Sequence, residues 1–243
     1  MAIPRPTKRT ALHYTHLALG AVMVDDHGWQ RPEQYGSPEE EIQAVHTGVG
    51  LCDISPVGKL DLKGRESVRV LEPLFSANVV PRVGQAQWTA TKTGDGVTEI
   101  KGLCCRLSSD HLLMVTEPGT VTAAEQALQR QVEGADGCAH LTNLTSALAA
   151  VQLVGPRSRD LLCKLTALDL SLSQFSDLTC AQGSVAQVHA LVVRSDIGSA
   201  LAYEIYCGRE FAEYLWNTLR DAGQEFAAVP FGVAAQRFLR GEG

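Results

Sequence analysis

The spacing of apolar side chains predicts several helices, and the clearest of them follows Ser37. Ser37 and Glu40 form a capping box, and Pro38 stands at the first helical position, where its missing N–H costs no hydrogen bond. The apolar positions that follow recur every three or four residues until Gly48 stops the pattern. We therefore predict a helix over residues 38–47.

Further segments show helical spacing with weaker boundary signals. Gly155 and Pro156 open one of them, Gly223 closes another, and apolar side chains gather on one face of a third. The additional predicted helices lie at 157–165, 211–222, 122–132 and 233–239.

Runs of apolar and β-branched residues lie between these helices. They predict strands at 59–63, 86–92, 103–107, 111–116, 147–154, 185–194 and 202–207. Only Ser108, Ser109 and Asp110 separate the third and fourth of these runs, which predicts a hairpin with a short polar turn. Because hairpins and helices are mixed along the chain, we predict an α+β fold with largely antiparallel sheets.

The composition is that of a globular protein. The chain has 243 residues, 45% of them hydrophobic and 20% charged, which is enough to bury a sizeable core. A net charge of -6 argues against nucleic acid or an anionic membrane as the main partner, since both require a basic surface. No apolar stretch is long enough for a signal peptide or a membrane span, so we predict a cytoplasmic protein with a small-molecule or protein partner.

The cysteines and histidines show no metal-binding spacing. The seven cysteines include no CxxC pair, and Cys104 and Cys105, adjacent in a predicted strand, point to opposite faces of the sheet. We predict no metal site and interpret the thiols as structural. The motifs GxGxxG, GxxxxGK[ST], HExxH and GxSxG are also missing, so no generic motif identifies a reaction.

Five segments in a fixed order carry a family resemblance. They read RTALHYTHLALGAVMVDDHGWQRPEQYGS, AVHTGVGLCDISPVGKLDLKG, VGQAQWTATKTGDG, TSALAAVQLVGPRSRDLLCKL and FGVAAQRFLR. Together they cover nearly the whole chain and resemble consecutive segments of the folate-binding glycine-cleavage T-protein (aminomethyltransferase) family. Each segment alone fits ordinary turns and helix starts, but their order makes the resemblance specific.

The resemblance implies two interleaved α/β domains around a channel that holds tetrahydrofolate. Residues 1–50 and 145–243 are expected to form the first folate-binding subdomain, and residues 51–144 the second. The C-terminal β-barrel domain that usually follows in the family is expected to be absent. The predicted helix 233–239 then either exposes apolar surface that a partner subunit or a second copy covers, or frays as a chain end.

The family's catalytic carboxylate, near the reactive folate nitrogens, sits in a GxxDD-like stretch that matches DGVTEIKGLCCRL here. Counted from the arginine, the acidic pair falls on Ile100 and Lys101, and a shift of one or two residues brings in Glu99. The resemblance therefore makes Glu99 the candidate catalytic carboxylate. A solvated turn residue is the alternative.

Glu204, in LAYEIYC, matches a family glutamate that hydrogen-bonds the pterin with its carboxylate. A solvent-facing strand position is the alternative. The preceding loop departs from the family, because it reads RSDIGSALA where an RTGYTGEDG-like stretch is usual.

Trp88, Glu117, Arg237 and Arg240 complete the candidate cofactor-binding set. Trp88 stands where the family often has a tyrosine, and either stacks on a flat ring or packs in the core. Glu117 lies near a family asparagine that contacts the folate. The two arginines fall close to a family arginine at the cofactor's carboxylate end, with surface salt bridges as the alternative.

The resemblance implies a tetrahydrofolate-dependent aminomethyltransferase or methyltransferase. The Ser55–Pro56 step looks more like the folate domains of sarcosine and dimethylglycine oxidases, which favours a subunit of a larger demethylating or amine-oxidising complex. The alternative is a non-catalytic folate-binding or assembly protein. The KGCYxGQE-like signature of the family's iron-sulfur assembly branch does not occur here.

Overall fold

The computed structural model describes residues 7–72, 81–92, 99–134 and 137–241. Within them, helices are mixed with mainly antiparallel strands, which confirms the predicted α+β fold. No helix in these ranges is long and apolar enough to cross a membrane.

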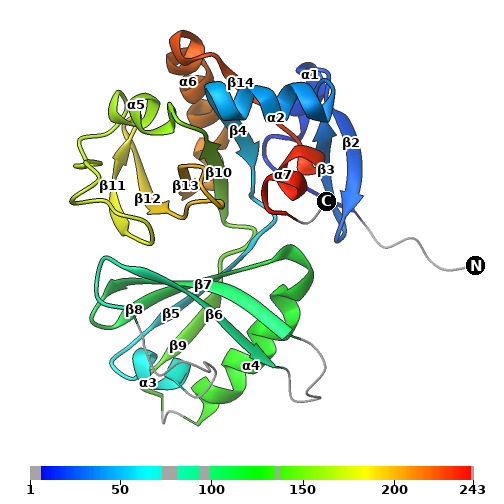
Figure 1. The fold of residues 1–243 in the computed structure, drawn as a ribbon. Coiled ribbons are helices and arrows are strands. Elements are labelled where there is room, and N and C mark those ends of the chain that lie inside the picture. Colours follow the sequence, from blue (N-terminus) through cyan, green and yellow to red (C-terminus); the bar gives the residue numbers. More distant parts are fainter. Residues whose placement is uncertain (1–6, 73–80, 93–98, 135–136, 242–243) are drawn as a thin grey trace, which may run out of the picture. The chain divides into compact units, whose positions relative to one another are not determined.

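The chain divides into two compact units (Figure 1). The first unit consists of residues 1–55, 149–177 and 182–243, and the second of residues 56–148 and 178–181. Each unit has its own sheet structure and is described by itself.

The first unit contains two sheets and several helices. The three-stranded sheet has the order β1 (Lys8–Arg9), β3 (Trp29–Gln34) and β2 (Val22–Asp26). The larger sheet has the order β11 (Cys180–Val185), β12 (Val188–Arg194), β13 (Ala202–Gly208), β10 (Leu148–Val154), β4 (Val49–Asp53) and β14 (Ala228–Pro230). The α-helices of this unit are α1 (His13–Ala18), α2 (Pro38–Thr47), α5 (Ser158–Cys163), α6 (Ala212–Gly223) and α7 (Val233–Leu239).

The second unit is one antiparallel sheet with helices on one face (Figure 1). The strand order is β6 (Ala86–Lys92), β7 (Glu99–Ser108), β8 (His111–Thr116), β5 (Gly58–Lys63) and β9 (His140–Asn143). The helices are α3 (Ser67–Leu71) and α4 (Val121–Glu133).

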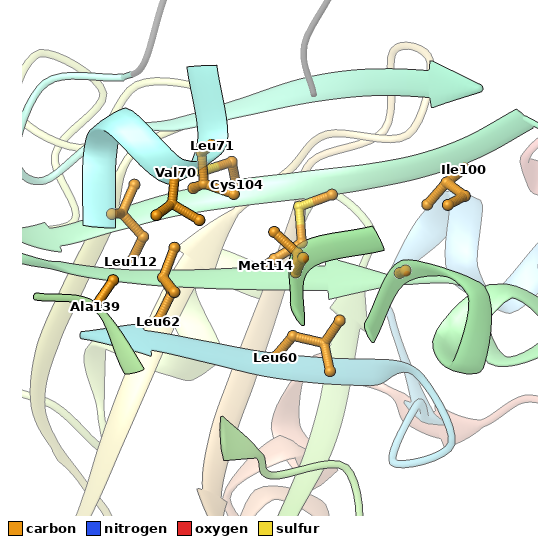
Figure 2. Packing of buried hydrophobic residues seen from close by; sticks show 11 residues of the cluster. Leu60, Leu62, Val70, Leu71, Ile100, Cys104, Leu112, Met114 and Ala139 are labelled. Atoms are coloured by element: carbon orange, nitrogen blue, oxygen red, sulfur yellow. The ribbon is translucent and has the colours of Figure 1, made fainter. Parts of the chain in front are cut away.

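Side-chain alternation along the strands builds the core of the second unit. Leu60 and Leu62 of β5 belong to a cluster of buried side chains that includes Val70 of α3 (Figure 2). Leu128 of α4 belongs to the same cluster. Asp61, between the two leucines, points to the other face and binds His111 Nε2 at 2.6 Å. The period-2 pattern therefore separates an apolar face from a polar row within one strand.

The firmest predicted elements are present. Ser37 Oγ accepts a hydrogen bond from the Glu40 amide, the Glu40 carboxylate accepts one from the Ser37 amide, and Gly48 ends α2. The predicted hairpin is confirmed as β7 and β8, with Ser108 and Asp110 hydrogen-bonded in its turn. The predicted helix 233–239 is α7.

The predicted strand over residues 185–194 is present as β12, but it begins at Val188. The chain reverses at Ala186 and Gln187, and β11 ends at Val185. Both turn residues have positive φ, 50° and 65°, as a two-residue type I′ hairpin turn requires. No local signal predicted this turn, because such positions are usually occupied by glycine or asparagine.

A buried hydrogen-bonded group joins α1 to β4 in the first unit. His16 Nε2 lies 3.0 Å from Asp53 Oδ2, and the Tyr35 hydroxyl lies 2.7 Å from His16 Nδ1. The Ser55 amide donates to the other Asp53 oxygen at 2.9 Å. Burial alone would raise the pKa of Asp53, but these donors and the nearby imidazole lower it to about 2.

Replacing Asp53 with asparagine tests this group. An aspartate whose folded-state pKa is lowered stabilises the fold fully above its unfolded pKa, and the stabilisation is lost as the pH falls through about 2. We expect Asp53→Asn to destabilise the protein at pH 6. The deficit should shrink by on the order of 2 kcal/mol between pH 5 and pH 2, measured by urea unfolding. Asp221→Asn, at an exposed position of α6, is the control, and a deficit that does not change with pH would contradict the assignment.

Candidate functional site

The carboxyl of Glu204 is buried on β13. Glu204 is 6% exposed, so the alternative of a solvent-facing strand position is wrong. Its strand neighbours Tyr203 and Ile205 point to the opposite face of the sheet, and Val193 of β12 lies directly beside it in the register. A carboxyl is rarely buried without partners, so the groups around Glu204 define the chemistry of this face.

Two neutral donors hold the Glu204 carboxyl. The Tyr206 hydroxyl donates to Oε2, and Gln152 Nε2 donates to Oε1 at 3.4 Å. Burial raises the pKa of Glu204, while Tyr206, the charge of Arg240 and Gln152 act in the opposite direction. Each carboxylate oxygen has two lone pairs, so the carboxyl keeps capacity for further N–H donors.

A chain of hydrogen bonds runs from Glu204 through Gln152, Gln236 and Arg31 to Asp26. Gln152 Oε1 accepts from Gln236 Nε2 at 3.2 Å, and Gln236 Oε1 accepts from Arg31 Nη2 at 3.0 Å. Arg31 Nη1 in turn donates to Asp26 Oδ2 at 2.6 Å. The four elements β10, α7, β3 and β2 thus contribute one buried polar side chain each.

Gln152, Gln236 and Arg31 were not among the site residues predicted from the sequence. All three are buried. A signal was available for Gln152, because it is the only polar residue in the apolar run of β10, and an isolated polar side chain in such a run needs a buried partner. Nothing local marked Gln236 or Arg31, because their partners lie on distant segments.

The structure separates the two candidate arginines. Arg237 Nη2 donates to Asp26 Oδ1 at 2.9 Å, so the alternative of a salt bridge holds for this residue, with a buried aspartate as the partner. Arg240, just after α7, is exposed, and its positive charge acts on the buried Glu204 carboxyl. Of the two candidate arginines, Arg240 is therefore the one whose charge acts on Glu204 while its own side chain is exposed.

Trp88 and Glu117 lie in the second unit. Trp88 on β6 is 54% exposed, so the alternative of a buried core tryptophan is wrong. It stands opposite Leu103 of β7, which stands opposite Val115 of β8, and Glu117 follows β8 two residues later. The register puts Trp88 and Val115 on the same face of the sheet, about 10 Å apart across two strand spacings.

Glu99 is the first residue of β7, opposite Lys92 of β6. Its side chain lies outside the described part of the structure. The next residue, Ile100, is buried in the core under α4. Ile100 is thus an apolar core position, and the role of Glu99 stays a prediction.

A cavity of about 600 Å³ opens in the first unit. It is bounded by the end of α2, the start of α5, the loop before β13 and the end of α7. Its lining residues are Val45, His46, Gly155, Pro156, residues 197–201, Phe238 and Leu239. Residues 197–201, which read IGSAL, contribute no acidic side chain and no tyrosine to this cavity.

The titratable residues limit the chemistry of the site. No group of three or more His, Cys, Asp or Glu residues within the described ranges is placed to hold a metal ion. Lys59, on the same sheet row as Trp88 and Val115, is fully buried. Within the first unit, the buried carboxyl of Glu204 and the exposed guanidinium of Arg240 suit recognition of N–H donors and of an anion, and within the second unit the exposed indole of Trp88 suits a flat ring.

Comparison with known proteins identifies the family. The model of the GCVT N-terminal domain matches residues 12–243. The aminomethyltransferase of Anoxybacillus flavithermus is 33% identical over 236 residues, which are 97% of this chain and 64% of that protein. Sarcosine oxidase subunit alpha of Corynebacterium sp. strain U-96 is 31% identical over 254 residues, 98% of this chain and 26% of that protein. The chain thus spans less than two thirds of the length of these relatives.

Two solved structures share the fold. Glycine cleavage system aminomethyltransferase T from Bartonella henselae matches with a TM-score of 0.84 and 20% identity, covering 96% of this chain and 62% of that chain. A chain of the heterotetrameric sarcosine oxidase from Corynebacterium sp. U-96 matches with a TM-score of 0.65 and 20% identity, covering 91% and 97%. At this level of identity the likeness concerns the fold alone.

Proposed function

Because the chain belongs to the family of the GCVT N-terminal domain, we propose that it binds tetrahydrofolate and transfers a one-carbon unit to it. The observation that carries this proposal is the buried carboxyl of Glu204, which is held by neutral donors and keeps free lone pairs. The names of the relatives, aminomethyltransferase and sarcosine oxidase subunit alpha, support a one-carbon reaction class.

Glu204 suits a pterin ring because the ring offers adjacent N–H groups. A carboxylate accepts two such donors side by side, and hydrogen bonds to a charged acceptor are the strong ones. The pKa of Glu204 is raised by burial, and N–H donors from a ligand would favour the ionised form and oppose that rise. A ring with two adjacent N–H groups would therefore supply the hydrogen-bond donors that the buried Glu204 carboxyl would otherwise receive from water.

Arg240 and Trp88 are the further side chains proposed to hold the cofactor. Arg240 supplies an exposed guanidinium whose charge acts on Glu204 and which suits the anionic tail of a folate. Trp88 exposes an indole face on which a flat ring can stack. Glu117 and Arg237 are also part of the proposed set. Glu117 is exposed, and Arg237 already donates a hydrogen bond to Asp26.

Tetrahydrofolate, when bound, supplies the nitrogen that takes up the one-carbon unit. For this chain we propose that Glu99 is the carboxylate that handles protons beside that nitrogen. Ile100 and Lys101 cannot take this role, because neither side chain carries a carboxyl group.

Replacing Glu204 with glutamine tests the binding site. The amide is nearly isosteric, but it presents N–H groups to a ring that offers N–H groups itself, so one favourable contact becomes a donor–donor clash. We expect the wild type to bind tetrahydrofolate in the micromolar range, about 8 kcal/mol, by calorimetry. Glu204→Gln should weaken binding about tenfold or more.

Glu210→Gln is the matched control, because Glu210 is exposed close to the end of the same strand. It should bind like the wild type. Equal affinities for Glu204→Gln and the wild type would contradict the role of Glu204. The absence of any binding by the wild type at millimolar tetrahydrofolate would reject the folate proposal as a whole.

Replacing Glu99 with glutamine separates a catalytic from a non-catalytic protein. With an aminomethylated lipoyl carrier as the donor, we expect turnover in the wild type and its loss in Glu99→Gln, while the affinity for tetrahydrofolate stays the same. Turnover that survives the substitution would reject Glu99 as the proton-handling group. Folate binding without any turnover by the wild type would favour the second candidate, a non-catalytic folate-binding or assembly protein.

A second copy of the chain, or a different subunit, is the proposed cover for α7. Phe238 is 58% exposed on this helix, and a chain of a heterotetrameric oxidase shares the fold over 97% of its length. We expect light scattering to show a dimer or larger species that Phe238→Asp dissociates. A wild-type monomer would contradict a second copy as the cover.

A further inference from the structure

Four side chains form a hydrogen-bonded relay in the first unit: Arg31, Gln236, Gln152 and Glu204. The links are 3.0 Å from Arg31 to Gln236, 3.2 Å from Gln236 to Gln152 and 3.4 Å from Gln152 to Glu204. All four are buried, and they come from β3, α7, β10 and β13. Two neutral amides thus connect a permanent cation to a carboxyl.

The chemistry of the two ends fixes the direction of the relay. A guanidinium donates and never accepts, so Arg31 forces Gln236 to turn its carbonyl oxygen toward it. The NH₂ group of Gln236 then points at Gln152, which must present its own oxygen in return. Gln152 is left with its NH₂ group toward Glu204, and the carboxylate there accepts it.

We propose that Arg31, Gln236 and Gln152 are positioning residues that hold an N–H donor on Glu204 and so keep its carboxylate oriented for a ligand. This inference rests on the proposed function for the identity of the ligand. The relay itself is a property of the chain's own residues. A glutamine facing Glu204 without such a constraint could present either its oxygen or its nitrogen.

Charged and titratable groups around Glu204 and the relay lie on the same strand and on other elements of the first unit. Tyr206 donates from the same strand, and Arg240 acts from the end of α7. Cys52 of β4 lies beside Gln152 in the sheet register, and burial raises its pKa to about 12, so its thiol stays neutral. At the far end, Asp26 binds both Arg31 and Arg237. Asp26 holds Arg31 at the far end, where the guanidinium donates to Gln236.

Gln236→Glu reverses the relay. A carboxylate at position 236 still accepts a hydrogen bond from Arg31, but it has no N–H to donate to Gln152. Gln152 must then turn its NH₂ group toward residue 236. Its carbonyl oxygen is left facing the carboxyl of Glu204. Two oxygens in contact are tolerated only when Glu204 takes up a proton. We expect the Glu204 titration midpoint, measured by ¹³C NMR of the carboxyl, to rise by about one pH unit or more.

Asn217→Glu is the control, because it adds the same charge at an exposed position of α6 in the same unit and leaves the relay intact. The Glu204 signal is assigned by its loss in Glu204→Gln. A midpoint in Gln236→Glu that exceeds the control by about one unit supports the relay. Equal midpoints in the two variants overturn it.

A neutral variant covers the case in which Gln236→Glu does not fold. Gln236→Met removes both amide contacts without adding charge. We expect the Gln152 side-chain NH₂ to become mobile by ¹⁵N relaxation and the Glu204 midpoint to rise. An equally ordered Gln152 with an unchanged midpoint would overturn the proposal.

These titrations contain no folate, so the two proposals fail separately. Unchanged midpoints would reject the relay and leave folate binding untouched. A wild type that does not bind tetrahydrofolate would reject the proposed function and leave the relay standing. If both hold, the pH dependence of folate affinity should shift in Gln236→Glu together with the Glu204 midpoint.

Discussion

Burying a carboxyl group constrains much of the first unit. An ionised carboxylate taken from water loses several kcal/mol of solvation unless donors replace the water. At Glu204 the donors are a tyrosine on the same strand and a glutamine on the next one, and that glutamine depends on two further side chains. The packing of α7 and β3 is therefore tied to the chemistry of one residue on β13.

The buried carboxyls Asp53 and Glu204 show how partners decide the charge state. Asp53 has an imidazole and a backbone amide as partners, and its pKa falls to about 2 despite burial. Glu204 accepts hydrogen bonds from the neutral side chains of Tyr206 and Gln152, and burial raises its pKa. Asp53 is thus a stable structural anion, whereas Glu204 responds to any ligand that brings N–H donors.

The chain keeps the fold of its family. The match over residues 12–243 and the TM-score of 0.84 extend across nearly the whole chain. Ile100 packs in the core of the second unit and Lys101 follows it, so neither side chain can supply the carboxylate that the proposed transfer needs.

The sequence by itself determined the α+β class, the family and the elements with strong local signals. The capping box at Ser37 and the polar turn at Ser108 act within a few residues, so the chain specifies them locally. The turn at Ala186 was not predicted, because the tertiary structure holds two ordinary residues in a conformation that glycine usually adopts. The contacts that link Arg31, Gln152, Gln236 and Glu204 span up to 205 positions, and only folding brings such residues together. Burial of a side chain is likewise decided by the tertiary structure. Trp88 is exposed and Glu204 is buried, although the local sequence around each residue was also compatible with the opposite.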